Sequence, residues 1–178
     1  MALDLLKLRI GHGFDLHPFV SGRTLRLGGI TVPHGAGLAG HSDGDVVLHA
    51  LCDALLSAGG LGDLGRHFPS EDPRLRGISS LHLLSESYVR ICGQGYVLLD
   101  ADLTIVAEAP RLSPFLPAME ERIAETLHVA RDTIHIKATT TDHIGAIGRR
   151  EGISATAVVL LAGHPPQESD AIQEHPVR

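Results

Sequence analysis

Three side chains in the first third of the chain have the types and spacing of metal ligands. Asp15 and His17 are two residues apart, so an extended strand directs both side chains to the same side. His49 lies in a helix-periodic segment, on the stripe opposite the apolar one, as does Asp53. Two imidazoles and one carboxylate suit a catalytic Zn²⁺, which leaves a fourth coordination position open. These residues predict a metal site; the alternative is that each is an ordinary polar group of a turn, strand end or helix.

A second polar group follows the segment 133–139. Residues 139–141 are threonines, and Asp142 adds a carboxylate. Hydroxyl and backbone N–H groups bind phosphate oxygens, and Mg²⁺ usually binds through one or two carboxylates plus substrate phosphates. The pattern indicates a phosphate-binding strand end, with a threonine-rich strand closed by an Asx turn as the alternative. Arg149 and Arg150 add guanidinium groups, either for a ligand or for a subunit contact.

Two shorter motifs carry less information. His41 and Ser42 precede a helix, where they either bind an anion at its N-terminus or simply cap it. Gly11 and Gly13 lack a third glycine and are not followed by a helix, which excludes a dinucleotide-binding fingerprint. The chain contains no Gly-x-Ser-x-Gly and no P-loop motif.

The periodicity of apolar residues predicts the elements that hold these side chains. Residues 8–15 mix strand formers with glycine, and a Gly-Gly pair joins two further short strands. We expect strands at 24–27, 30–32, 96–108, 133–139 and 153–162, helices at 46–58, 79–92 and 113–127, and a long loop at 62–76. This order predicts an α/β fold of the α+β type, with a mixed β-sheet covered by about three helices. Residues 1–162 form one compact domain in this prediction, and residues 163–178 form a disordered tail.

Composition narrows the possible partners. The 178 residues carry 15 Lys+Arg against 21 Asp+Glu, a net charge of −6, and only six aromatic side chains. Binding to nucleic acid or to an anionic membrane is therefore not expected. Cys52 and Cys92 are expected to be free, buried thiols of a soluble cytoplasmic protein, since their spacing fits no zinc ribbon and the N-terminus does not look like a signal peptide.

Four segments resemble one enzyme family in its own motif order. They read RIGHGFDLH at 9–17, HSDGDVVLH at 41–49, GDLGRHFP at 62–69 and KATTTD at 137–142. Residues 8–162 are similar to the 2-C-methyl-D-erythritol 2,4-cyclodiphosphate synthases of non-mevalonate isoprenoid biosynthesis. The resemblance implies a homotrimer with active sites at the subunit interfaces. It also implies a phosphorus–oxygen lyase that converts 4-diphosphocytidyl-2-C-methyl-D-erythritol 2-phosphate into the cyclic diphosphate and CMP.

The resemblance assigns roles to individual residues. It implies Zn²⁺, or another divalent transition metal, at Asp15, His17 and His49, and Mg²⁺ or Mn²⁺ at Asp142, bridging the substrate diphosphate. It implies that His41 and Thr140 stabilise the transition state. The implied substrate contacts are Asp15, His17, His41, Ser42, Asp63, Leu64, Gly65, Phe68, Asp72, Ala107, Ala109, Pro110, Arg111, Leu112, Ser113, Thr139, Thr140, Thr141, Asp142, Ala146 and Arg149.

The chain departs from the family pattern in a few places. Asp142 stands where the family usually has Glu, Ser70 replaces a usual Asp, and Ala146 is small where a larger residue is common. Arg149 and Glu151 resemble residues that line the family's trimer axis. Two other functions stay open from the residues alone: a metal-dependent phosphohydrolase that activates water at the Asp/His/His site, and a non-catalytic nucleotide-binding module.

Overall fold

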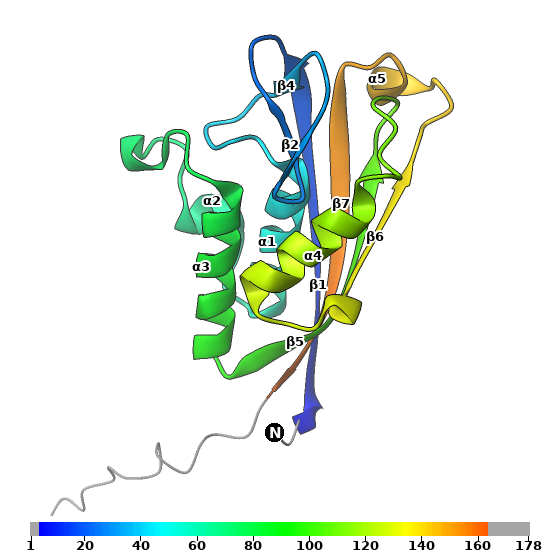
Figure 1. The fold of residues 1–178 in the computed structure, drawn as a ribbon. Helices are drawn as coiled ribbons and strands as arrows, with labels where there is room; N and C mark the ends of the chain where they lie inside the picture. Colours follow the sequence, from blue (N-terminus) through cyan, green and yellow to red (C-terminus); the bar gives the residue numbers. More distant parts are fainter. Residues whose placement is uncertain (1–3, 164–178) are drawn as a thin grey trace, which may run out of the picture.

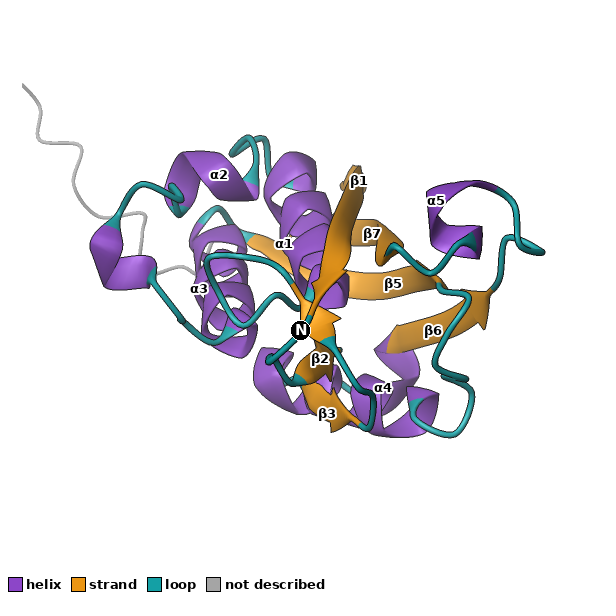
Figure 2. Ribbon diagram, turned by 90° about the horizontal axis from the view of Figure 1, so that it is seen from above, coloured by secondary structure: helices purple, strands orange, loops and turns teal. Residues whose placement is uncertain are grey.

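A five-stranded mixed sheet carries the longer helices on one side (Figure 1, Figure 2). The computed structural model describes residues 4–163. The predicted tail lies, from residue 164 onward, outside the described residues. The strand order is β4-β1-β7-β5-β6; only the β5/β6 pair is parallel. The sheet strands are β1 (Asp4–Val20), β4 (Gly37–Leu38), β5 (Tyr96–Val106), β6 (Ile134–Thr139) and β7 (Gly152–Gly163).

The remaining elements flank this sheet. β2 and β3 form a separate antiparallel hairpin whose turn residues, Gly28 and Gly29, both have positive φ, as the tight hairpin turn requires. These elements are β2 (Leu25–Leu27), β3 (Ile30–Val32), α1 (Val46–Ala58), α2 (Leu64–His67), α3 (Ser80–Gly93), α4 (Leu116–Leu127), α5 (Gly145–Gly148) and two 3₁₀ turns, Pro73–Leu75 and Arg131–Thr133. No helix of the described part of the chain is long and apolar enough to span a membrane.

The two faces of β1 differ in what covers them. Leu8, Ile10, Phe14 and Leu16 alternate along the strand, and all four are exposed. The residues between them face α1, since side chains alternate across a strand. A Cβ added at Gly13 would lie 2.0 Å from the carbonyl oxygen of Ala50, so the two backbones touch there. The pair of glycines that excluded a dinucleotide site thus serves close strand–helix packing.

Helix α1 begins at a carboxylate that also fastens the hairpin. The N-cap residue Asp45 is fully buried, and its side chain accepts hydrogen bonds from the backbone N–H groups of Gly28, Gly29, Val47 and Leu48. Burial raises the pKa of Asp45, whereas these N–H groups act in the opposite direction. One side chain therefore sets the position of the helix relative to β2 and β3.

The predicted fold is confirmed, with corrections in detail. β1 is longer than expected, the predicted loop 62–76 contains α2 and a 3₁₀ turn, and α4 begins at Leu116 because Phe115 is its N-cap. Cys52 is fully buried where α3 packs on α1, so the prediction of a buried thiol is confirmed for this residue. Cys92 is exposed, so the prediction that both thiols are buried is wrong for this residue. α5 and β4 were not predicted, since two to four residues carry no periodicity.

Candidate active site

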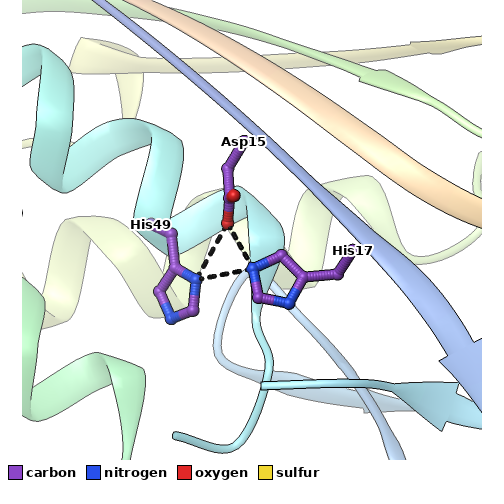
Figure 3. A group of neighbouring side chains, drawn as sticks. All are labelled: Asp15, His17 and His49. Carbon is purple, nitrogen blue, oxygen red and sulfur yellow. Dashed lines mark hydrogen bonds and ion pairs between the residues drawn. The ribbon is translucent and has the colours of Figure 1, made fainter. Parts of the chain in front are cut away.

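Asp15, His17 and His49 converge on one point between β1 and α1. The Oδ2 atom of Asp15 lies 2.7 Å from Nε2 of His17 and 2.9 Å from Nδ1 of His49 (Figure 3). The two ring nitrogens are 3.3 Å apart. Among the described residues, this is the group of His, Cys, Asp and Glu side chains arranged to hold a metal ion. The spacing Asp15-x-His17 places both on the α1 side of the strand, as predicted.

The geometry fits a tetrahedral divalent metal. Ligand bonds of about 2.0–2.2 Å at tetrahedral angles separate the ligand atoms by about 3.3–3.6 Å. The separation of 3.3 Å between the two ring nitrogens falls in this range, and the separations of 2.7 and 2.9 Å from Asp15 are shorter, as expected for hydrogen-bonded pairs that a metal ion would spread slightly. The Nδ1 atom of His17 contacts the carbonyl oxygen of Ala39. A carbonyl only accepts, so this Nδ1 carries a proton, and Nε2, which faces Asp15, is the nitrogen that a metal ion would take as its ligand.

The surroundings of Asp15 and His17 favour the charged form of both side chains. Burial by itself would raise the pKa of Asp15, but hydrogen bonds and charge from His17 and His49 hold it well below its usual range. Burial would lower the pKa of His17, and its bonds to Asp15 and to the Ala39 carbonyl outweigh this and raise it. The carboxylate therefore stays ionised, as a metal ligand must.

A cavity of about 240 Å³ opens beside the cluster. It is lined by His17, His41, Ser42, His49, Leu64, Phe68 and six further residues of the segments 40–42 and 69–83. His41 also borders a wider hollow of about 650 Å³ with Ser70, Glu71 and Asp72. The structure thus brings the predicted metal ligands close to three of the predicted substrate contacts, Leu64, Phe68 and Asp72, with His41 bordering both hollows.

The loop residues in this region have defined local partners. Asp63 is the N-cap of α2 and accepts a hydrogen bond from the backbone N–H of Arg66 at 2.8 Å. Asp53 of α1 accepts from the backbone N–H of Leu64 at 2.7 Å, which ties the loop to the helix that carries His49. Gly65 belongs to α2. Asp72 pairs with Arg74, which lowers the pKa of Asp72 to about 2.

The second predicted group lies at a separate cavity. The ends of β5 and β6 enclose about 270 Å³, lined by Ala107, Glu108, Pro110, Arg111, Leu112, Ser113, Leu116, Ala138, Thr139 and Thr140. Ala109 precedes Pro110 through a cis peptide bond. Thr140 Oγ1 lies 3.3 Å from the backbone nitrogen of Asp142, as in an Asx- or ST-type turn. The buried Thr141 Oγ1 has no hydrogen-bond partner.

Three predicted site residues lie away from the Asp/His/His cluster. Asp142 is exposed, with a φ of 50°, and is not part of that cluster. Ala146 is exposed on α5, and Arg149 pairs with Glu151 at 2.6 Å. The structure therefore does not bring Asp142 to the first metal site, in agreement with the separate role that the resemblance gave it.

The strand register shows where the Asp/His/His cluster lies relative to the threonine run 139–141. Leu16 on β1 pairs with Ser154 on β7, Ser154 pairs with Val106 on β5, and Val106 pairs with Thr139 on β6. The metal cluster and the threonine run therefore lie at the same end of the sheet, three strand spacings apart, or roughly 14 Å. Among the described residues that line these two cavities, none lines both.

Three groups at the site were missed from the sequence. The carbonyl of Ala39, the hydroxyl of Ser80 and the carboxylate of Asp43 all hold parts of the cluster in place. Asp43 lies in the short segment before the predicted helix 46–58, and Ser80 lies 31 residues after His49, so no local spacing could join them.

The fold and the site define a class of protein. A mixed β-sheet presents an Asp/His/His cluster suited to a divalent metal ion at a cavity, with a hydroxyl-rich strand end at the same end of the sheet, an arrangement that fits an enzyme acting on phosphorylated small molecules. The model of the YgbB family matches residues 8–162, and the chain belongs to this family.

Individual relatives agree with this assignment. A curated protein of Moorella thermoacetica, named 2-C-methyl-D-erythritol 2,4-cyclodiphosphate synthase, is 56% identical over 154 residues, covering 86% of this chain and 94% of the relative. A solved structure of such a synthase with CDP bound has a TM-score of 0.79 at 40% identity, covering 86% of this chain and 99% of that chain. The bifunctional IspDF of Campylobacter jejuni has a TM-score of 0.86 at 38% identity; 92% of this chain matches 43% of that protein.

Proposed function

We propose that this chain cyclises 4-diphosphocytidyl-2-C-methyl-D-erythritol 2-phosphate to 2-C-methyl-D-erythritol 2,4-cyclodiphosphate and releases CMP, a step of isoprenoid biosynthesis. The observation that carries the proposal is the Asp15–His17–His49 cluster beside a cavity, in a chain of the family whose curated relatives bear this name. The reaction is an intramolecular phosphoryl transfer. An oxygen of the 2-phosphate forms a bond to the β-phosphorus, and the bond from that phosphorus to the oxygen of CMP breaks.

This reaction requires the protein to position the substrate and to neutralise its charge, and it requires no nucleophile from the protein. Since the attacking oxygen belongs to the substrate, catalysis depends on holding its two phosphorylated ends together. This agrees with the lack of a nucleophile motif in the sequence. His41 borders both the cluster cavity and the wider hollow, where it donates to phosphate oxygens in this proposal. Thr140 donates its hydroxyl at the nucleotide side.

Two kinds of cation complete the proposal. Asp15, His17 and His49 would hold Zn²⁺ or another divalent transition metal, and Asp142 would hold Mg²⁺ or Mn²⁺ together with the diphosphate. When bound, these ions supply Lewis-acid polarisation and charge neutralisation at phosphoryl oxygens. Asp142 is shorter than the usual Glu by one methylene, so its contact to a cation runs through water or is weaker.

The nucleotide is bound at the cavity between β5 and β6. Its lining includes residues 107, 108 and 110–113, and the side chains of Arg111 and Ser113 are hydrogen-bonded to each other at 3.1 Å. CDP is present in the solved relative, and we assign the cytidyl group of the substrate to this cavity by that likeness. The threonine run from 139 to 141 then faces the diphosphate.

A homotrimer with active sites between subunits is the assembly that we propose. The exposed apolar side chains Leu8, Ile10, Phe14, Leu16 and Val158 lie on the sheet face opposite α1, an arrangement typical of a surface that another subunit covers. The two cavities have separate linings in one chain, so a neighbouring copy can place its nucleotide cavity against the metal cavity of this one. The cytoplasmic location, like the absence of nucleic-acid and membrane partners, stays a prediction from the sequence.

A ³¹P NMR time course with the purified protein, the cytidyl substrate and Mg²⁺ tests the function. We expect a cyclic diphosphate signal to grow with one equivalent of CMP and to stop growing when a strong zinc chelator is added. His49→Ala is expected to lose Zn²⁺ and nearly all turnover, while sedimentation still shows the trimer. Inorganic phosphate or a linear diphosphate would instead identify a phosphohydrolase, and saturable CDP binding without turnover would identify a binding module.

A further inference from the structure

The second ring nitrogen of His49 has a fully buried environment of its own. Its Nε2 atom lies 2.9 Å from the Oγ atom of Ser42 and 3.1 Å from the Oγ atom of Ser80. Ser80 is fully buried at the first residue of α3, and Ser42 is 6% exposed. Backbone hydrogen bonds from Asp43 to Ile78 and from Gly77 to His41 hold these two segments side by side.

Asp43 determines the direction of the hydrogen bond between Ser80 and His49. The Oγ atom of Ser80 is 2.5 Å from Oδ1 of Asp43, whose carboxylate also accepts from the backbone N–H of Ser80 at 3.2 Å. An ionised carboxylate only accepts, so the single hydroxyl proton of Ser80 is committed to Asp43. Toward His49, Ser80 then offers a lone pair and no proton. The contact is a hydrogen bond only if Nε2 of His49 carries hydrogen.

Ser42 by itself would leave the choice open. A hydroxyl can donate to a bare Nε2 or accept from Nε2–H, and the Oγ atom of Ser42 also accepts from the backbone N–H of Gly44 at 3.1 Å. If Nε2 were bare, its lone pair would face that of Ser80 at 3.1 Å. The contact with Ser42 is therefore compatible with either tautomer of His49, whereas the contact with Ser80 requires hydrogen on Nε2.

From this geometry we infer that Ser80, oriented by Asp43, is a positioning residue that keeps the proton of His49 on Nε2 and presents the Nδ1 lone pair to the metal. The inference rests on the metal site of the proposed function. His17 obtains the opposite arrangement from the Ala39 carbonyl, with hydrogen on Nδ1 and the lone pair on Nε2. Each histidine thus has its own acceptor on the far side of its ring, and the other ring nitrogen of each faces Asp15, where a shared metal ion would take its lone pair.

With hydrogen on Nε2 of His49, the hydroxyl proton of Ser42 is available to a ligand. Ser80 Oγ, at 3.4 Å, lies beyond the usual O–H···O range of about 2.5–3.0 Å, and Nε2 and Gly44 N–H are both donors. Ser42 lines the cavity beside the cluster. Its proton is therefore free for an anionic oxygen bound there, such as one of a phosphate group.

Zn²⁺ affinity of matched variants tests the inference. Ser80→Ala removes the acceptor, whereas Ser87→Ala removes an equally buried hydroxyl of the same helix that donates to the carbonyl of Leu83. Competition with a chromophoric chelator is expected to show Zn²⁺ binding about 10- to 100-fold weaker in Ser80→Ala, the range found for loss of such outer partners. Ser87→Ala should match wild type within about twofold. Equal affinity of Ser80→Ala and wild type, both folded by circular dichroism, would overturn the inference.

The tautomer of His49 supplies a readout that general loss of packing does not move. In the metal-free wild type the Asp15 carboxylate, 2.9 Å from Nδ1 of His49, competes for the same proton, so the spectra are recorded in an Asp15→Ala background. Long-range ¹H–¹⁵N spectra of metal-free Asp15→Ala at alkaline pH are expected to show hydrogen on Nε2, and adding Ser80→Ala should shift the population toward Nδ1. Hydrogen on Nδ1 in Asp15→Ala would refute the inference even if the double variant does not fold. Wild-type protein that binds no Zn²⁺, together with hydrogen on Nε2 in Asp15→Ala, would instead refute the metal site of the proposed function and leave the role of Ser80 intact.

Discussion

One added methyl group at residue 13 should pull the metal ligands apart. In Gly13→Ala the new Cβ would lie 2.0 Å from the carbonyl oxygen of Ala50 and 2.7 Å from the backbone nitrogen of Ala54. Both atoms belong to the backbone of α1, so no side-chain rotation relieves the contact. A Cβ does not approach other heavy atoms within 3.0 Å, so β1 and α1 must separate by about 1 Å.

The size of this movement decides the effect on the site. His49 belongs to α1, while Asp15 and His17 belong to β1, so the ligand atoms separate by a similar distance. Metal–ligand distances tolerate only about 0.2 Å. We expect Zn²⁺ binding to weaken and turnover to fall by about 100-fold, the effect of a 1 Å misplacement. Overpacking of about 1–3 kcal/mol should also lower Tm by roughly 2–12 °C.

A matched glycine provides the control. A Cβ at Gly35 would meet no atom within 4 Å, and its backbone is outside the left-handed region, so Gly35→Ala should keep the Tm and Zn²⁺ affinity of the wild type. Thermal unfolding and chelator competition measure both variants. A Gly13→Ala protein with the wild-type Tm and Zn²⁺ affinity would show that the touching backbones of β1 and α1 do not position the cluster.

Three further predictions follow from single residues. Thr140→Ala should lower kcat about 10- to 100-fold with a smaller change in KM. An unchanged kcat would show that Thr140 does not stabilise the transition state. A thiol reagent should modify one cysteine per native chain, the exposed Cys92, because burial raises the pKa of Cys52 to about 12; two fast thiols in native protein would contradict this. In chelator-treated protein, the lowered pKa of Asp15 stabilises the folded state at pH values above the pKa that Asp15 has in the unfolded chain. The raised pKa of His17 also stabilises the folded state, and this contribution is lost as the pH rises through the pKa of His17 in the folded protein. The stability difference between wild type and Asp15→Asn should therefore be larger at pH 5 than at pH 8.5 in urea unfolding, and a difference that grows with pH would be the wrong sign.

Local spacing was enough for the parts of the site that one element carries. Asp15 and His17 share a face because side chains alternate along a strand, and the predicted helix 46–58 coincides with α1. The spacing did not show that α3 covers part of α1, where Cys52 lies fully buried. Periodicity reports which residues share a face but not what packs on that face.

The sequence by itself therefore determined the ligand types, the strand and helix that carry them, and the family to which they belong. Only the tertiary structure decided that Ser80 and Asp43 meet the far nitrogen of His49, and that the metal and nucleotide cavities have separate linings. The reason is physical: residue order sets direction along each element, whereas contacts between distant segments depend on how closely their backbones pack. Where Gly13 of β1 meets the backbone of α1 at Ala50, the absence of a side chain on Gly13 sets the distance between the two elements. This effect is visible only when both segments are in place.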